Sequence, residues 1–326
     1  MKTLDPDVRH LLALAKQAGY PPFQSLTPAN ARSAYAAGWA SMQSEGGEVA
    51  SVKDVTIESP TGSLKVRIYR GEGTQPQEVL PCLMFLHGGG WVIGNLESHD
   101  RLCRRLANVA RICVVAVDYR LAPEYPFPAA LEDSASAWCW LHAHVNELNI
   151  HPHAIGVGGD SAGGNLAAAL ALMGREDELH APVFQALIYP ALDLTAQSDS
   201  YQSVTADVPL TAATMHYFIA HYTPNPDDRK NWRASPLLVS SLKGVAPALV
   251  MTVAHDPLSD EGRAFAKKLD ESGVRVCAMH FNDHVHGLLG MGKFVPAANH
   301  IGDHIFKTIG FELHRCANNS LQSPAK

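Results

Sequence analysis

The chain has 326 residues, of which 46% are hydrophobic and 18% are charged, and it carries a formal net charge of −6 at pH 7. This length allows one large α/β domain with an additional element, and the acidic balance gives no electrostatic case for binding nucleic acid or an anionic membrane. No run approaches the ~20 consecutive apolar residues that a membrane helix needs, so we expect neither nucleic acid nor a membrane as a partner.

The first 45 residues are predicted to be helical. Asp5-Pro6 and Thr27-Pro28 each place a capping side chain directly before a proline, which suits the first position of a helix. The short apolar run at residues 11–15 lacks the long uncharged core of a secretory signal. Six cysteines occur without a C-x-x-C pair, which is typical of a reduced compartment, and we therefore expect a cytoplasmic protein. Three of them lie in predicted strands and should be buried: Cys82, Cys113 and Cys277.

Strand and helix signals alternate over most of the remaining chain. Two strands, at residues 52–57 and 64–70, are joined by a predicted turn at residues 59–62. The alternation that follows is typical of a mostly parallel sheet with helices on both faces. Only residues from about 318 to 326 resemble a frayed tail.

Three consecutive glycines follow an apolar strand at residues 83–86, in the sequence His87-Gly88-Gly89-Gly90-Trp91. A flexible turn would account for one or two glycines, but not for the histidine before them or the tryptophan after them. Residues without side chains let backbone N–H groups converge on an oxyanion, and this HGGG pattern resembles the oxyanion loop of lipases and esterases. The expected donors are the N–H groups of Gly88, Gly89 and Ala162. His87 should brace the loop.

Residues 159–163 read GDSAG and fit the G-x-S-x-G nucleophile elbow, in which a serine occupies a tight turn between a strand and a helix. An apolar run precedes the motif at residues 154–158, and strong helix formers follow it at residues 165–173. That helix would direct its N-terminal amides and its dipole at the place where an oxyanion forms. Ser161 is therefore the predicted nucleophile.

Residues 195–232 interrupt the alternation, with a predicted helix that begins at Thr211. We expect this segment and residues 1–45 to form one helical cap over the active site. The catalytic core would then comprise residues 46–194 and 233–326. The tryptophan of the glycine loop and one apolar face of the cap helix should form the wall of the substrate pocket. These predicted pocket residues are Trp91, Met215, Phe218 and Ile219.

The acid and the base should follow the serine in the order Ser, acid, His. Asp256 comes after a predicted buried strand at residues 247–254, and His286 comes after residues 274–281, which alternate like a strand. Active sites of open α/β sheets form where such strands end. We therefore predict Asp256 as the acid and His286 as the base.

Two neighbours are the alternatives to this assignment. Asp260 has a structural explanation, because it stands in the first turn of a helix that Ser259 is expected to cap. His284 should face away from His286 if the segment is extended. Gly287, in contrast, lets the backbone turn beneath the ring of His286.

These motifs together resemble the hormone-sensitive-lipase family of α/β-hydrolase carboxylesterases. The resemblance covers nearly the whole chain and implies an α/β-hydrolase fold with the same three catalytic residues. Ser259 departs from the arginine that often follows the Asp-Pro-Leu segment, which is a change of surface type. The matching segments are HGGGW at 87–91, DYRLAPE at 118–124, PFPAA at 126–130, GDSAGGN at 159–165, DPL at 256–258 and HG at 286–287.

The expected function is the hydrolysis of short- to medium-chain acyl esters, as small-molecule substrates, through an acyl-enzyme intermediate. An amidase or a lactonase can use the same triad, and a non-catalytic ligand-binding member of the fold is the other alternative. No cofactor is expected. Three H-x-H pairs occur among the 17 histidines, but none has a third ligand at the spacing of a metal motif, so no metal is expected either. The resemblance also allows for a homodimer.

Overall fold

Eight strands form one sheet in the computed structural model, which describes residues 3–60, 62–204 and 206–322. Strands β1 and β2 form a hairpin, and β2 is also antiparallel to β4. All other neighbours are parallel, which confirms the predicted mostly parallel sheet. The order across the sheet is β1 (Ser51–Ser59), β2 (Gly62–Arg70), β4 (Cys113–Val117), β3 (Leu80–Leu86), β5 (Ile150–Asp160), β6 (Gln185–Ile188), β7 (Ala248–His255) and β8 (Val276–Val285).

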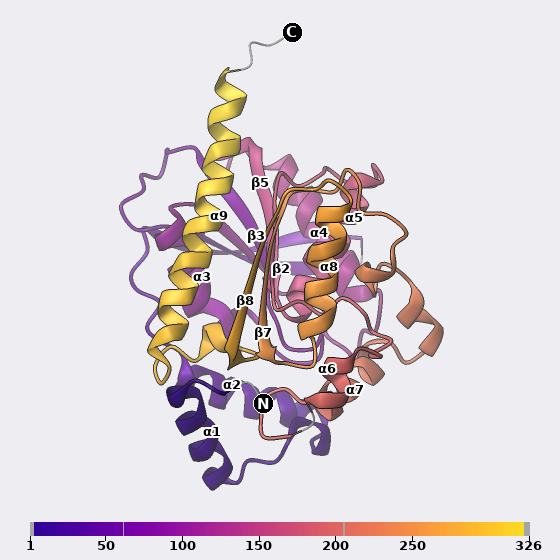
Figure 1. Ribbon diagram of the computed structural model, residues 1–326. Helices are drawn as coiled ribbons and strands as arrows, with labels where there is room; N and C mark the ends of the chain where they lie inside the picture. Colours follow the sequence, from indigo (N-terminus) through magenta and orange to yellow (C-terminus); the bar gives the residue numbers. More distant parts are fainter. Residues whose placement is uncertain (1–2, 61, 205, 323–326) are drawn as a thin grey trace.

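Helices cover both faces of the sheet, as the alternation predicted. Helices α3 (Leu96–Ala110) and α9 (Pro296–Gln322) pack on one face. The other face carries α4 (Ala129–Ala143), α5 (Ala162–Arg175) and α8 (Ser259–Glu271) (Figure 1). Because successive side chains of a strand point to opposite faces, the buried strands supply both apolar cores. In β3, for example, Leu83 and Phe85 join the core under α3 and α9, whereas Met84 and Leu86 join the other.

Three further long helices gather at the end of the sheet to which β7 and β8 point (Figure 1). Helices α1 (Pro6–Ala18), α2 (Pro28–Met42) and α7 (Ala212–Tyr222) begin after Asp5, Thr27 and Thr211, whose side chains accept hydrogen bonds from the first turns. These three helix starts were predicted. The shorter helices are η1 (Phe23–Ser25), α6 (Asp199–Ser203), η2 (Pro226–Lys230), η3 (Pro236–Leu238) and η4 (Leu288–Gly290).

The two helical segments that we expected to form a cap touch each other. The Thr214 hydroxyl of α7 donates to Gln24 Oε1 at 2.8 Å, and the Tyr217 hydroxyl donates to the Leu26 carbonyl oxygen at 3.1 Å. The rings of Phe23 and Phe218 lie 6.2 Å apart. Residues far apart in sequence are therefore joined by polar and aromatic contacts. No helix of the described ranges is long and apolar enough to cross a membrane.

Several local predictions are wrong or incomplete. Cys82 and Cys113 are buried as predicted, but Cys277 is exposed, because β8 is an edge strand that the helices only partly cover. Helix α9 continues to Gln322, so residues 318–322 are helical, while residues 323–326 of the predicted tail lie outside the described part. Thr61 of the predicted turn also lies outside it.

Candidate active site

Ser161 occupies the turn between β5 and α5, as the elbow motif predicted. Its backbone has φ 56° and ψ −117°, a conformation that L-residues rarely adopt. The Ser161 N–H donates to the Ile188 carbonyl oxygen at 2.8 Å and so fixes the turn to the neighbouring strand β6. A Cβ atom at Gly163 would overlap the Leu86 carbonyl oxygen, so this position requires glycine.

The three predicted catalytic side chains form one continuous hydrogen-bonded row. His286 Nε2 lies 2.9 Å from Ser161 Oγ, and His286 Nδ1 lies 2.7 Å from Asp256 Oδ2. Asp256 is completely buried, whereas Ser161 and His286 keep 7% and 8% of their surface exposed. This geometry fits a Ser-His-Asp triad, in which a buried carboxylate orients the imidazole and the imidazole reaches the hydroxyl.

The register of two parallel strands explains why Asp256 and His286 meet. His255, the last residue of β7, pairs with Val285, the last residue of β8, so the next residue of each strand leaves the sheet at the same place. The second carboxylate oxygen of Asp256 accepts the Leu258 N–H at 2.9 Å, which holds the side chain in position. The Tyr189 ring packs 4.6 Å from the ring of His286.

The two alternative residues have other partners. Asp260 Oδ2 accepts the Ser200 N–H at 2.8 Å and thereby anchors α6. Leu258, not Ser259, is the residue that precedes α8, so the predicted N-cap residue of this helix is wrong by one position. His284 lies inside β8, which is longer than predicted. The expectation that an extended segment turns His284 away from His286 is wrong, because residues two apart in a strand share a face. The two histidines differ because His286 lies beyond the end of β8.

The oxyanion loop differs from the prediction at its first glycine. The Gly88 N–H donates to Asp160 Oδ1 at 2.9 Å, so the structure does not support Gly88 as an oxyanion donor. The N–H groups of Gly89, Gly90 and Ala162 make no hydrogen bond within the described residues. Gly90 has φ 58°, and a Cβ there would overlap the ring of Phe218. Free donors are therefore present in the loop and at the start of α5.

His87 is placed to brace this loop. Its ring stacks on Tyr119 with centroids 4.2 Å apart, and the Tyr119 hydroxyl donates to the His87 carbonyl oxygen at 2.6 Å. His87 Nδ1 lies 2.8 Å from the Gly88 carbonyl oxygen. Burial, together with the charge of His99, lowers the pKa of His87 to about 3. A histidine that stays neutral in this way suits a structural position better than that of a general base.

Asp160 and His99 are two buried residues that the sequence reasoning did not identify. His99 Nε2 lies 3.2 Å from Asp160 Oδ1, and His99 Nδ1 lies 2.9 Å from the Ser98 hydroxyl. Burial alone would raise the pKa of Asp160, but the charge and hydrogen bond of His99, with smaller contributions from His87 and His286, hold that pKa below its ordinary value. Asp160 occupies a position of the elbow motif at which any residue is allowed, so the motif could not predict its contacts with His99 and Gly88.

The four predicted pocket residues are buried in an apolar cluster. Trp91 is completely buried and stacks on Tyr222 of α7, with ring centroids 4.4 Å apart. Met215, Phe218 and Ile219 belong to the same cluster. Helix α7 therefore packs directly on the glycine loop, through Phe218 beside Gly90 and through Tyr222 on Trp91.

A pocket of about 280 Å³ lies between α2 and the core. None of the four predicted residues is part of its lining, which consists of Arg32, Tyr35, Ala36, Gly94, Asn95, Ser98, Asp118, Tyr119 and Leu121. Among the described residues, one group could hold a metal ion, namely Asp5, Asp283 and His284, and it does not include the Ser161 row.

Comparison with known proteins finds a hydrolase family model and relatives that are ester hydrolases. A family model described as the alpha/beta hydrolase fold matches residues 83–290. The carboxylic ester hydrolase LipN of Mycobacterium tuberculosis (strain H37Rv) is 41% identical over 246 residues, which cover 74% of this chain but 65% of LipN. The chain thus spans somewhat less than two thirds of LipN. The ethyl acetate hydrolase of Pseudomonas putida is 36% identical over 303 residues, which cover 91% of this chain and 95% of that protein.

Solved structures that resemble this chain are also ester hydrolases. The ester hydrolase EH1AB1 from the metagenome of Lake Arreo, in complex with a derivative of bipyridine phosphonate, has a TM-score of 0.92 and 36% sequence identity. The alignment covers 96% of this chain and all of that one. The family model covers more than half of the chain, and a relative above 30% identity covers nearly all of it. The chain therefore belongs to the α/β-hydrolase family, among the carboxylic ester hydrolases of the hormone-sensitive-lipase type.

Proposed function

We propose that this protein hydrolyses carboxylic esters through an acyl-enzyme, with Ser161 as nucleophile, His286 as base and Asp256 as the orienting acid. The observation that carries this proposal is the hydrogen-bonded row Ser161–His286–Asp256, at 2.9 and 2.7 Å. A serine hydroxyl is a weak nucleophile near neutral pH unless an adjacent base accepts its proton. His286 is within reach of that proton, and Asp256 holds the imidazole in the required tautomer.

The reaction proceeds in two halves. Ser161 Oγ attacks the ester carbonyl carbon while its proton passes to His286 Nε2, and the tetrahedral intermediate expels the alcohol as His286 returns the proton to it. Water then attacks the acyl-serine ester, losing a proton to His286. Collapse releases the carboxylic acid and restores the Ser161 hydroxyl. Asp256 stays ionised throughout and stabilises the transient imidazolium.

The oxyanion of each tetrahedral intermediate is assigned to the N–H groups of Gly89, Gly90 and Ala162. These groups have no acceptor among the described residues, whereas the Gly88 N–H donates to Asp160. Ala162 is the first residue of α5, so the positive end of that helix dipole lies beside the developing charge. Preorganised donors of this kind often supply the largest single share of the rate enhancement.

The substrate class is assigned to esters of short to medium acyl chain. The proposed cap consists of the first 45 residues and the 195–232 segment, and its helix α7 packs on the oxyanion loop. Apolar side chains that are buried against the loop, rather than exposed as a large patch, favour dissolved substrates over an oil surface. The relative named ethyl acetate hydrolase supports the same choice.

A panel of p-nitrophenyl esters of graded chain length, beside the matching p-nitroanilides, tests this function. We expect turnover of acetate to hexanoate esters with little or no turnover of the anilides. A preference for the anilides, or for a lactone under the same conditions, would identify a different acyl-transfer enzyme. Absence of any turnover would identify a binding protein on this fold.

A further inference from the structure

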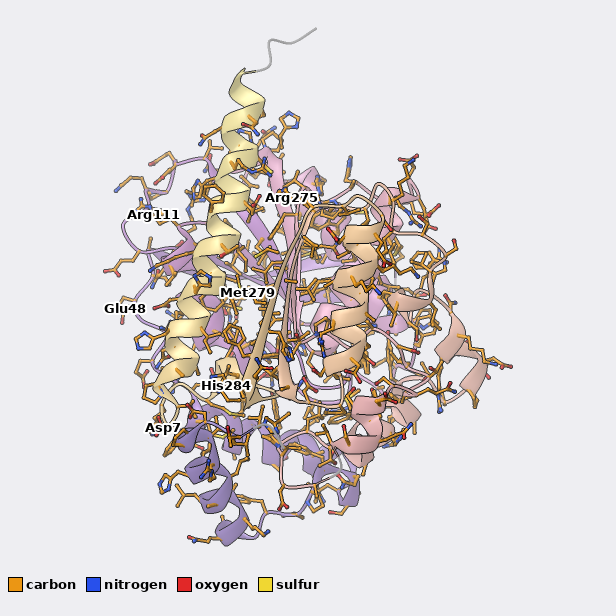
Figure 2. The ribbon with its side chains drawn as sticks, in the orientation of Figure 1. Asp7, Glu48, Arg111, Arg275, Met279 and His284 are labelled. Carbon is orange, nitrogen blue, oxygen red and sulfur yellow. The ribbon has the colours of Figure 1, made fainter. Side chains whose placement is uncertain are left out.

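The N-terminal helix meets the end of β8 beside the active site. The Asp5 N–H donates to the Asp283 carbonyl oxygen at 2.9 Å. Asp5 Oδ1 caps α1 by accepting the N–H groups of Asp7 and Val8. Figure 2 labels His284 near the end of β8 and Asp7 on the adjoining helix. This contact brings a residue from the start of the chain next to the strand that ends one residue before His286.

Three potential metal ligands converge at this contact. Asp5, Asp283 and His284 each offer one ligand atom, and these three atoms all lie within 4.8 Å of one another. His284 Nε2 faces Asp283 Oδ1 at 3.7 Å, which is longer than a hydrogen bond. The sequence showed only the His284-Val285-His286 pair and no third ligand; the fold supplies two carboxylates instead.

The imidazole of His284 is buried beside Asp283. Its side chain is only 5% exposed and makes no hydrogen bond within the described residues. Nε2 is the nitrogen that faces Asp283, and Nδ1, the other ring nitrogen, is a buried atom without a hydrogen-bond partner. Buried polar groups are normally hydrogen-bonded, because leaving them unpaired costs free energy. The Asp283 side chain, in contrast, is about half exposed, so an ion could enter from solvent.

We propose that Asp5, Asp283 and His284 bind a divalent transition-metal ion of the Zn²⁺ type. A neutral imidazole nitrogen and two carboxylate oxygens are a ligand set that suits Zn²⁺ and Co²⁺, with water completing the shell. Bond lengths of about 2.0–2.2 Å require the ligand atoms to approach to roughly 3.3–3.5 Å. The exposed Asp283 side chain can make that movement. The cation would also offset the repulsion between two neighbouring carboxylates.

The site is separate from catalysis and acts on the cap. It contains none of the residues that contact Ser161, and it joins α1 to the strand that ends next to His286. The bound ion would therefore fasten the N-terminal helix to the core. The proposal does not depend on the esterase assignment, because its readouts are metal binding and thermal stability.

The test is a Co²⁺ titration of the full chain after treatment with EDTA and removal of the chelator. We expect a visible ligand-field absorption that saturates at one Co²⁺ per chain and is displaced by Zn²⁺. Asp283→Asn and His284→Asn should each weaken binding by about tenfold or more. Asp5→Asn should also weaken it while preserving the helix cap, since asparagine caps as well as aspartate. Asp7→Asn, an exposed acid on the same helix, is the matched control and should bind as the wild type does.

Thermal unfolding supplies the second readout. Zn²⁺ should raise the melting temperature of the wild type and of Asp7→Asn, but not that of Asp283→Asn, because an ion that binds only the folded state stabilises it. Asp283 is half exposed, so its substitution should leave the metal-free melting temperature nearly unchanged even if His284→Asn folds poorly. Absence of saturable binding would overturn the proposal. Binding that persists unchanged in Asp283→Asn would do so as well.

Discussion

Asp160 Oδ1 accepts the Gly88 N–H at 2.9 Å, and this bond joins the residue before the nucleophile to the first glycine of the oxyanion loop. The same oxygen lies 3.2 Å from His99 Nε2. The nucleophile turn and the loop that supplies the oxyanion donors are thus held together by one buried carboxylate. Because Asp160 holds the oxyanion donors in place, we expect its replacement to affect turnover rather than substrate affinity.

Replacing Asp160 with alanine should lower kcat more than it changes KM. The change frees the Gly88 N–H and lets the loop shift, so donors aimed at the transition state lose alignment. We expect a loss approaching the ~10²-fold that removal of one oxyanion donor costs. Asp160→Asn keeps an acceptor and should retain more activity. Steady-state kinetics with p-nitrophenyl butyrate measure both; a kcat for Asp160→Ala within twofold of wild type would show that the loop holds its position without this residue.

His286 and His284 should respond very differently to the same substitution. His286→Asn removes the group that lies 2.9 Å from Ser161 Oγ, so turnover should nearly vanish. His284→Asn, assayed in EDTA, should retain much of its activity, because its ring faces Asp283. The assay is ester hydrolysis under single-turnover conditions. Equal damage from both changes would leave the choice between the two histidines without support.

Acid should destabilise the protein through His87. Because burial lowers the pKa of His87 to about 3 in the folded state, the unfolded chain, with an ordinary pKa near 6.5, binds more protons between these values. The free energy of unfolding should therefore fall as the pH falls below 6.5, by roughly 2 kcal/mol at pH 5 from this group. Urea unfolding at pH 7 and pH 5 measures the difference.

Histidine variants separate this contribution from others. His87→Asn should make the pH dependence shallower. His142→Asn should make it shallower by nearly as much between pH 7 and pH 5, because burial and the neighbouring His180 lower the pKa of His142 to about 4, which is also below this range. An unchanged slope in His87→Asn would show that His87 is not the group responsible.

Substrate preference should depend on acyl-chain length, because Trp91 and the α7 side chains Phe218 and Ile219 are proposed to surround the acyl chain. Each methylene that fits should improve kcat/KM by up to ~0.8 kcal/mol, and the gain should reverse once the acyl chain fills the site. No increase in rate is expected when the substrate passes its solubility limit. Initial rates with acetate to laurate esters, and with emulsified triacylglycerol, provide the measurement. Faster hydrolysis of emulsified long-chain triacylglycerol than of dissolved butyrate would identify a true lipase instead.

The candidate catalytic residues could be predicted from the sequence because each follows the end of a predicted strand. Ser161 follows an apolar strand and precedes a helix, and Asp256 and His286 each follow a strand, so chain order alone could rank them. The helix starts at Asp5, Thr27 and Thr211 were equally visible, because capping depends on adjacent residues. Local patterns sufficed for these features.

Features that depend on distant partners could not be predicted in this way. The direction of the Gly88 N–H is set by Asp160, which lies in another segment, so the glycine motif alone assigned the wrong donor. Cys277 was expected to be buried because it lies in a predicted strand, but it is exposed because β8 is at the sheet edge. The approach of Asp5 to Asp283 and His284 depends on how α1 docks on the core.

Ser161→Ala, assayed with p-nitrophenyl butyrate and compared with wild type in thermal unfolding, tests the central claim most directly. The change removes one oxygen atom from a turn whose backbone bonds remain, so the melting temperature should stay close to that of the wild type. The rate should fall by about 10³-fold or more, with a small residual rate from the oxyanion loop. Near-normal hydrolysis by a correctly folded Ser161→Ala protein would contradict the account.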